Sequence, residues 1–417
     1  MSMNGRSTWM EVSVIILILE CGVGIPAYGF AGGTGAPNNP YQIATPADLV
    51  AMSLDSSLLD RHFVLVNDID LDPNLPGGRV FDNALIAPDG DPNVNVGNGL
   101  PFDGVFDGRG HTIRHLCIAA KYGYDTGLFG DLGGIVKDLH LKDVRISGAP
   151  CGALVGMGVG GTILRCSVTG KVTGSNYLGG LVGGAFSITL LQCESRADVS
   201  GDTSSVAGGL AGSIFGMSSQ VIECRATGTV VGGTLAGGLI GSSERAVMLR
   251  CAAVCQVTAD EIAGGLIGHG PYDGSVADCY ARGSATGVVV GGLIGNLENG
   301  GVYNSRILNS YAACDMLAPS DSAKSVVGSG LFGKKQWSWQ PSIVIGCFWD
   351  KELPKVPLVA DLSPANYGTG LTTRQMQQQE TFKQAGWDLG YTWAMLEDGY
   401  PALRWELVGE AGQKPQN

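Results

Sequence analysis

The five-residue sequence Gly-Gly-Leu-x-Gly occurs five times in the middle of this chain, beginning at residues 179, 208, 237, 264 and 291. Successive copies are 29, 29, 27 and 27 residues apart, and looser copies begin at residues 126, 152 and 329. A repeat of this length is typical of solenoids, in which each repeat packs only against its two neighbours. We therefore expect a stack of similar structural units.

A second column of residues indicates how the repeats align. Its members occupy equivalent places in successive repeats: Cys166, Cys193, Cys224, Cys251, Cys279, Ser310 and Cys347. Two residues earlier, every repeat has an aliphatic residue: Leu164, Leu191, Ile222, Leu249, Ala277, Leu308 and Ile345. This alternation has the period of a β-strand with one buried face. We predict that the cysteines form one internal file of free thiols and that the aliphatic residues share their buried face.

The glycine content determines the fold class. A helical repeat is unfavourable, because each glycine inside a helix costs about 1 kcal/mol, whereas glycines suit the sharp corners between short strands. The sequence predicts an all-β protein, a right-handed parallel β-helix (β-solenoid) of about eight coils, with small helix-containing N- and C-terminal caps. The leucines of the repeated motif are predicted to be buried: Leu181, Leu210, Leu239, Leu266 and Leu293.

The composition divides the chain into four parts. Residues 1–31 contain an apolar run from Val12 to Leu19 followed by small residues, as in a signal peptide or an N-terminal anchor. Residues 32–75 are predicted to form the N-terminal cap, with a helix beginning after Thr45. Residues 76–348 form the solenoid, and residues 349–417 form a Trp-rich C-terminal cap and tail. We expect a secreted, periplasmic or cell-surface protein, without a transmembrane segment other than that anchor.

The repeats resemble a known family. The segments "GGLVGG…LLQCESRADVSG" and "GGLIG…VADCYARGSATG" are similar to the GLUG-motif repeat of exported bacterial, in particular planctomycetal, proteins. The resemblance extends over about residues 32–407, including "PFDGVFDGRGHTI" and "YPALRW". It implies an exported β-helical protein and carries no catalytic motif. Ser310 and the long step from residue 291 to 329 depart from the pattern.

The charge balance limits the functions to be considered. The chain has 26 basic and 38 acidic side chains, a net charge of −12 that disfavours nucleic acid as a partner. We expect a non-catalytic solenoid with a structural, adhesive or interaction role at the cell surface, whose partner is a polysaccharide or a surface protein. The alternative is a polysaccharide lyase or glycoside hydrolase on the same scaffold, which would need clustered carboxylates or a basic residue in a groove.

Two groups of residues are candidate binding sites. Oxygen-bearing side chains alternate in "DGDPNVN", where Asp89, Asp91, Asn93 and Asn95 fit either a calcium loop or a solvated loop. No other cofactor is expected. The outward residue after the cysteine column becomes aromatic in the last three repeats: Tyr280, Tyr311 and Phe348, with Trp349 beside them. These aromatic residues would either bind sugar rings on an open wall or support the Trp-rich cap.

Overall fold

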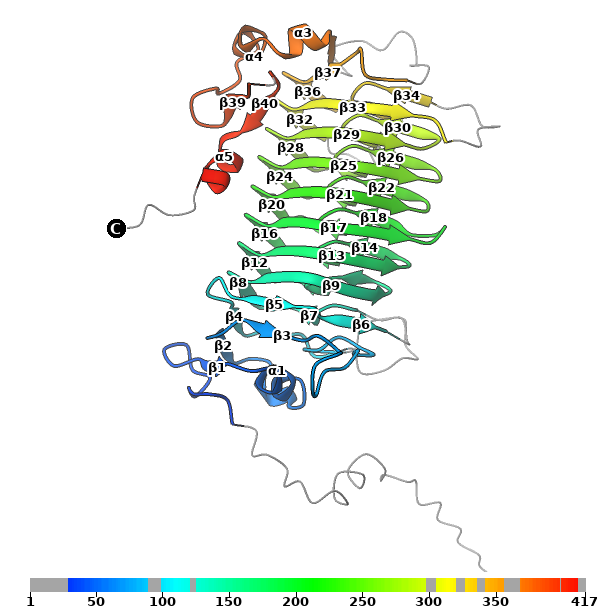
Figure 1. Cartoon of the computed structure of the whole chain (residues 1–417). Coiled ribbons are helices and arrows are strands. Elements are labelled where there is room, and N and C mark those ends of the chain that lie inside the picture. Colours follow the sequence, from blue (N-terminus) through cyan, green and yellow to red (C-terminus); the bar gives the residue numbers. More distant parts are fainter. Residues whose placement is uncertain are drawn as a thin grey trace, which may run out of the picture.

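The computed structural model describes residues 29–88, 99–120, 125–297, 305–319, 327–335, 342–355, 368–397 and 399–411. The chain winds as a right-handed parallel β-solenoid with small caps at both ends, as the repeats predict (Figure 1). Seven complete turns lie between residues 135 and 335, and an incomplete turn at residues 105–132 precedes them. Each complete turn contributes one strand to each of four sheets.

The first sheet has 11 strands and the second has 12. The first contains β1 (Tyr41–Ile43), β2 (His62–Leu65), β4 (Val105–Asp107), β8 (Ile135–Lys137), β12 (Thr162–Leu164), β16 (Thr189–Leu191), β20 (Gln220–Ile222), β24 (Val247–Leu249), β28 (Ser275–Ala277), β32 (Arg306–Leu308) and β36 (Ile343–Ile345). The second contains β3 (Ile69–Asp70), β5 (Thr112–Arg114), β6 (Cys117–Ala119), β9 (His140–Gly148), β13 (Ser167–Gly174), β17 (Glu194–Gly201), β21 (Arg225–Gly232), β25 (Ala252–Ala259), β29 (Tyr280–Thr286), β33 (Tyr311–Leu317), β37 (Phe348–Asp350) and β38 (Thr369–Leu371).

The third sheet has seven strands and the fourth has eight. The third contains β10 (Cys151–Gly152), β14 (Tyr177–Gly179), β18 (Val206–Gly208), β22 (Leu235–Gly237), β26 (Ile262–Gly264), β30 (Val289–Gly291) and β34 (Val327–Ser329). The fourth contains β7 (Phe129–Leu132), β11 (Val155–Val159), β15 (Val182–Phe186), β19 (Ala211–Phe215), β23 (Ile240–Glu244), β27 (Ile267–Tyr272), β31 (Ile294–Leu297) and β35 (Phe332–Lys335).

Helices occur in the two caps, and β1 and β2 of the N-terminal cap extend the first sheet. The N-terminal cap contains α1 (Pro46–Met52) and the 3-10 helix η2 (Ser56–Leu58). The helix α1 begins at the predicted place, because Thr45 accepts from the Asp48 amide and the Asp48 carboxylate accepts from the Thr45 amide. The C-terminal cap contains α3 (Thr373–Met376), α4 (Gln379–Gln384), an antiparallel pair of β39 (Trp393–Met395) and β40 (Pro401–Leu403), and α5 (Arg404–Ala411).

The repeated Gly-Gly-Leu-x-Gly motif lies at the corner between the third and fourth sheets. In the copy at residues 237–241, a Cβ atom on Gly237 would overlap the carbonyl oxygen of Ile240, and one on Gly238 would overlap that of Gly265 in the next turn. A Cβ atom on Gly241 would lie 2.6 Å from the Gly212 oxygen in the preceding turn. The motif recurs because the backbones approach too closely for side chains. The leucine column beside it is fully buried, as predicted.

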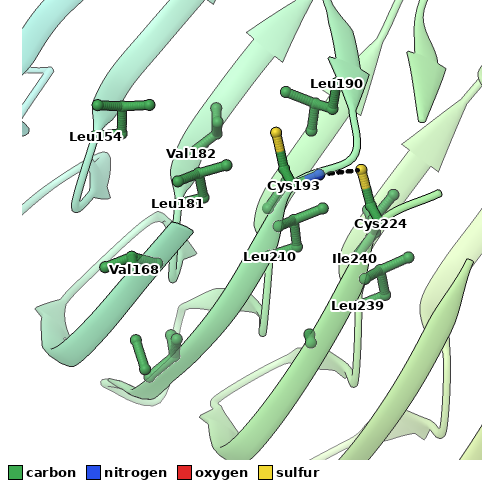
Figure 2. Packing of buried hydrophobic residues seen from close by; sticks show 14 of the residues in the cluster. Leu154, Val168, Leu181, Val182, Leu190, Cys193, Leu210, Cys224, Leu239 and Ile240 are labelled. Atoms are coloured by element: carbon green, nitrogen blue, oxygen red, sulfur yellow. Dashed lines mark hydrogen bonds between the residues drawn. The ribbon is translucent and has the colours of Figure 1, made fainter. Parts of the chain in front are cut away.

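The cysteine column also lies inside the rod, which confirms the register of the repeats. All ten described cysteines are buried free thiols, and Figure 2 shows Cys193 and Cys224 in successive turns beside Leu181, Leu210 and Leu239. Each column thiol donates to the carbonyl two residues earlier, as Cys251 does to Leu249 at 3.4 Å. The Ser310 hydroxyl makes the same bond to Leu308 at 2.7 Å, so this position suits a small side chain that can donate a hydrogen bond.

The aliphatic residues two positions before the cysteines are not buried, and this prediction was wrong. The residue between them adopts a left-handed conformation in every turn, with φ from 46° to 64°: Arg165, Gln192, Glu223, Arg250, Asp278, Asn309 and Gly346. This residue forms a corner between the first and second sheets, so the alternation of strand faces does not continue through it. The buried residue lies one position earlier, as Val221 and Met248 do, while Ile222 and Leu249 are half-exposed.

Candidate functional site

The predicted aromatic column forms with the expected register. Strand pairing aligns Ser167, Glu194, Arg225, Ala252, Tyr280, Tyr311 and Phe348 across seven successive strands of the second sheet. The Tyr280 and Tyr311 rings are stacked, with centroids 5.2 Å apart and planes 8° apart. However, Tyr280 is 3% exposed and Tyr311 is 0% exposed. The column is therefore covered along these turns.

The C-terminal cap is what covers the column. It crosses the end of the solenoid and then returns along its side, so that α5 lies beside the middle turns (Figure 1). Apolar residues of the cap pack with the two tyrosines in one cluster that includes Met376, Phe382, Trp387, Trp393 and Leu403. The cap thus seals the last turn and also contacts the outer wall of several preceding turns.

Three cap tryptophans bind the left-handed corner of three different turns. The Trp405 indole donates to the carbonyl of Arg250 at 2.9 Å, and the Trp387 indole donates to that of Gly346 at 2.8 Å. The Trp393 indole donates to the Asp278 carboxylate at 3.2 Å. Because the corners repeat once per turn, the tryptophans hold the cap in register with the stack.

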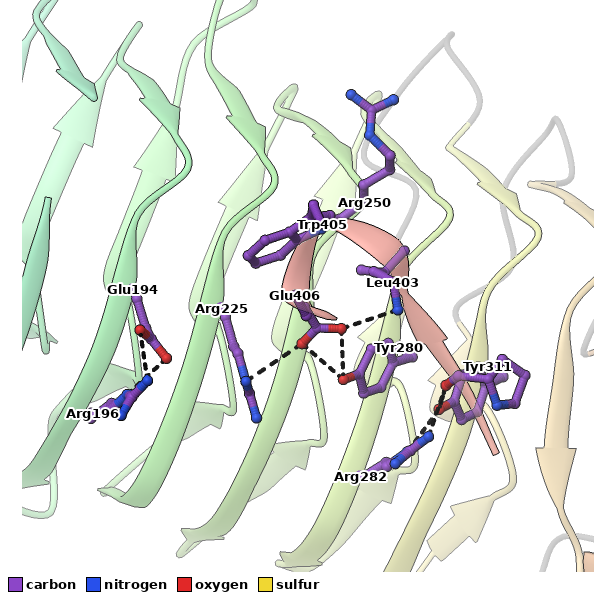
Figure 3. Close-up of polar contacts among 11 residues, drawn as sticks. Glu194, Arg196, Arg225, Arg250, Tyr280, Arg282, Tyr311, Leu403, Trp405 and Glu406 are labelled. Atoms are coloured by element: carbon purple, nitrogen blue, oxygen red, sulfur yellow. Dashed lines mark hydrogen bonds and ion pairs between the residues drawn. The ribbon is translucent and has the colours of Figure 1, made fainter. Parts of the chain in front are cut away.

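A buried carboxylate joins the cap to the wall (Figure 3). Glu406 is 8% exposed, and the Tyr280 hydroxyl lies 3.0 Å from both of its oxygens. The Leu403 amide donates to Glu406 at 3.1 Å, and the Arg225 Nε lies 3.5 Å away. Burial raises the pKa of Glu406, and the Arg225 charge and the Tyr280 hydrogen bond partly oppose this effect.

The second tyrosine is held by Arg282. The Arg282 Nε donates to the Tyr311 hydroxyl at 2.7 Å, and the Tyr311 hydroxyl donates to the carbonyl of Pro401 at 2.6 Å (Figure 3). The Arg282 guanidinium also lies 5.1 Å from the Tyr280 ring centroid and 5.2 Å from that of Tyr400. Both tyrosine hydroxyls are therefore engaged within the protein.

The predicted sugar-binding role of these aromatic residues is therefore corrected. Tyr280 and Tyr311 lie beneath the cap, and the half-buried Phe348 ring packs against Phe382 and Trp387 with centroids 5.6 Å and 5.9 Å away. Trp349 is half-buried against the main core. The other interpretation, in which the cap packs on this column, describes the structure, because a Trp-rich segment needs an apolar surface to bury its rings.

The pH dependence of stability tests the buried carboxylate. Because folding raises the pKa of Glu406, the folded protein binds more protons than the unfolded chain at pH values between 4.5, the ordinary pKa of a glutamate, and the pKa of Glu406 in the folded protein. We expect the free energy of unfolding to fall as the pH rises through this window, and to fall less in Glu406→Gln. Urea unfolding of both proteins between pH 4 and pH 7 measures the difference. The exposed Glu380→Gln should follow the wild type, and identical pH slopes in all three proteins would refute the assignment.

The predicted calcium residues Asp89, Asp91, Asn93 and Asn95 lie outside the described residues. Within the described ranges, no group of three or more His, Cys, Asp or Glu side chains could hold a metal ion. No helix in these ranges is both long and apolar enough to cross a membrane.

A cleft of about 550 Å³ lies between α1 and residues 70–81 in the N-terminal cap. Its two carboxylates are already engaged, since Asp70 lies 2.8 Å from His115 Nδ1 and Asp72 accepts from Asn74. Hydrogen bonds from Asn74 lower the pKa of Asp72, whereas a catalytic acid needs a raised value. Among the described carboxylates, raised pKa values occur at Asp278 of the wall, which contacts the cap, and at Glu406 of the cap itself.

An exposed group of aromatic and apolar residues lies on a different wall and was not predicted from the sequence. Phe186 and Phe215 are register partners at the ends of β15 and β19, each seven residues after the first glycine of its repeat. Phe186 is 54% exposed, and Val159 in the preceding turn is 52% exposed. Their equal distance from the repeated glycines could have indicated that the two phenylalanines lie side by side. Neither, however, belongs to the glycine, leucine or cysteine columns that align the repeats.

No protein-family model matches the chain. It is 38% identical over 419 residues to a "Putative Gly-rich membrane protein" of Evansella cellulosilytica, a match covering 89% of this chain and 45% of that protein. It is 35% identical over 157 residues to halomucin of Haloquadratum walsbyi, covering 36% of this chain and 2% of halomucin. The chain thus spans less than half the length of either relative.

Among solved structures, the chain is similar to a putative immunoglobulin A1 protease from Bacteroides ovatus, with a TM-score of 0.40 and 19% identity. The match covers 90% of this chain and 95% of that one. At this TM-score, the match adds nothing to the fold described above and says nothing about activity.

Proposed function

We propose that this chain is an exported, non-catalytic β-solenoid module of the GLUG-motif type, with a structural or adhesive role at the cell surface. The observation that carries the proposal is the continuous apolar core through seven turns, capped at both ends, which makes a rigid rod about 34 Å long at about 4.8 Å per turn. The names of its relatives, halomucin and a Gly-rich membrane protein, support a surface setting, and their greater length fits a module within a longer array.

The alternative role, a polysaccharide-degrading enzyme, has less support. A glycosidase needs an accessible carboxyl group with a raised pKa beside a second carboxylate. Among the described residues, the carboxyl groups with raised pKa are Asp278 and Glu406, and both are bonded to partners in the cap network: Asp278 to Trp393 and Glu406 to Tyr280 and Leu403. We therefore assign this rod no chemistry.

Protease treatment of intact cells tests the proposal. The full chain is expressed in a bacterium with an epitope inserted after Gly160, which is exposed between two strands. We expect external protease to remove the epitope from intact cells while a cytoplasmic marker survives. Full protection of the epitope, or release of reducing sugar from polysaccharides by the purified chain, would contradict the proposal.

A further inference from the structure

Five residues in three successive turns form a surface that we call the mid-rod patch: Met157, Val159, Tyr177, Phe186 and Phe215. Val159 and Phe186 are exposed, and the other three are half-exposed. Strand pairing places Val159, Phe186 and Phe215 side by side on β11, β15 and β19. Tyr177 joins them from β14, and its ring meets the Phe215 ring edge-on with centroids 5.8 Å apart. Unlike the column under the C-terminal cap, this patch is open, because Phe186 and Val159 are each more than half exposed.

Side chains of the patch lie directly over glycines. A Cβ atom on Gly184 would lie 2.9 Å from the end of the Met157 side chain and 3.6 Å from the Tyr177 ring. A Cβ atom on Gly216 would lie 3.5 Å from the Phe186 ring. The side chains therefore lie across bare backbone. A protein partner usually anchors its central residues in a pocket, whereas side chains that lie across backbone offer their sides to an extended ligand.

The strands that carry the patch contain no charged side chain. Residues 148–164, 172–193 and 203–222 contain no Asp, Glu, Lys, Arg or His, although the chain has 26 basic and 38 acidic side chains. These stretches contain the strands of the third and fourth sheets of the same three turns. In the adjoining turns Asp131 pairs in register with Met157, and Glu244 and Arg245 follow Ser243, the partner of Ile214, so charged side chains border the patch. The patch itself offers no charge to pair with a charged ligand, so it matches a neutral partner. Polar groups do stand beside the rings in sequence, at Asn176 and Ser187.

From this geometry we propose that the mid-rod patch binds a neutral polysaccharide. One face of a sugar ring carries C–H groups, which are attracted to the electron-rich face of an aromatic ring, while its hydroxyl edge stays in reach of polar groups. Rings that are already held by the fold provide contact area at low entropic cost. The inference rests on the proposed function, since a surface module is exposed to polysaccharides outside the cell.

Calorimetric titration of the full chain tests the inference. The probes are four neutral soluble polysaccharides, namely laminarin, xyloglucan, mannan and dextran, with alginate as the acidic comparison. We expect at least one neutral polysaccharide to bind and alginate not to bind. Phe186→Ala/Phe215→Ala should weaken binding at least tenfold, and Val159→Lys, which keeps every ring but adds a charge, should also weaken it. The control Tyr391→Ala removes an 89% exposed ring of the cap and should bind like the wild type.

Several outcomes would overturn the inference. They are an absence of binding to all four neutral probes, equal affinities in the wild type and Val159→Lys, or stronger binding of alginate. Binding of neutral phosphatidylcholine vesicles through these residues in place of polysaccharide would also overturn it. The protease test on intact cells is independent of these results, so a displayed protein that binds no neutral polysaccharide would remove this inference and leave the proposed function in place.

Discussion

Replacement of Trp393 by alanine should lower the free energy of unfolding by about 3–5 kcal/mol, the usual cost of removing a fully buried aromatic side chain. Trp393 is 0% exposed, and its ring centroid lies 4.5 Å from that of Trp387 and 6.0 Å from that of Tyr311. The change also leaves the half-buried Asp278 carboxylate without its indole donor. Urea unfolding followed by circular dichroism measures the loss.

The neighbouring Tyr391→Ala is the matched control, because this ring is 89% exposed and its loss should change stability by less than about 0.5 kcal/mol. Because a solenoid can unfold in parts, the near-ultraviolet signal of the cap tryptophans should be lost from Trp393→Ala before the far-ultraviolet signal of the strands. Equal stability of Trp393→Ala and Tyr391→Ala would show that the cap does not hold the last turns.

The variant Leu239→Ala should destabilise the protein by about 2–5 kcal/mol, because it opens a cavity in the middle of the stack. Leu239 is 0% exposed, and its backbone is held between Leu210 and Leu266 of the adjacent turns. Little space is left for the neighbours to close the cavity, since the flanking glycines already place backbones in close contact. Chemical denaturation of the purified variant measures the effect.

Leu249→Ala is the control for this second prediction, and it also tests the left-handed corner. Leu249 precedes Arg250, lies on the outer face of β24 and is half-exposed, so its truncation should cost clearly less than that of Leu239. If the two variants were equally destabilised, Leu249 would be facing the core and the corner at Arg250 would be wrong.

The repeats predict the architecture of the rod because packing in a solenoid is local. Each turn contacts the turns before and after it. The residues equivalent to Gly237, Leu239 and Cys251 in successive repeats therefore stack on one another along the rod. The glycine motif, the leucine column and the cysteine file were all predictable for this reason. The orientation of Leu249 was not, because a left-handed residue at Arg250 reverses the side-chain alternation, and arginine gives no sign in the sequence that it adopts such a conformation.

The sequence alone determined the fold class, the register of the turns and the leucine and cysteine columns of the core, since these follow from side-chain size and period. Only the tertiary structure decided which outward aromatic residues reach solvent. Tyr280 and Tyr311 are buried because a segment about 100 residues later returns along the wall and places Trp393 and Glu406 on them. Phe186 and Phe215 stay open on another wall. The repeat period shows which side chains lie on the outer face of a turn, but whether a distant segment covers that face depends on the tertiary structure.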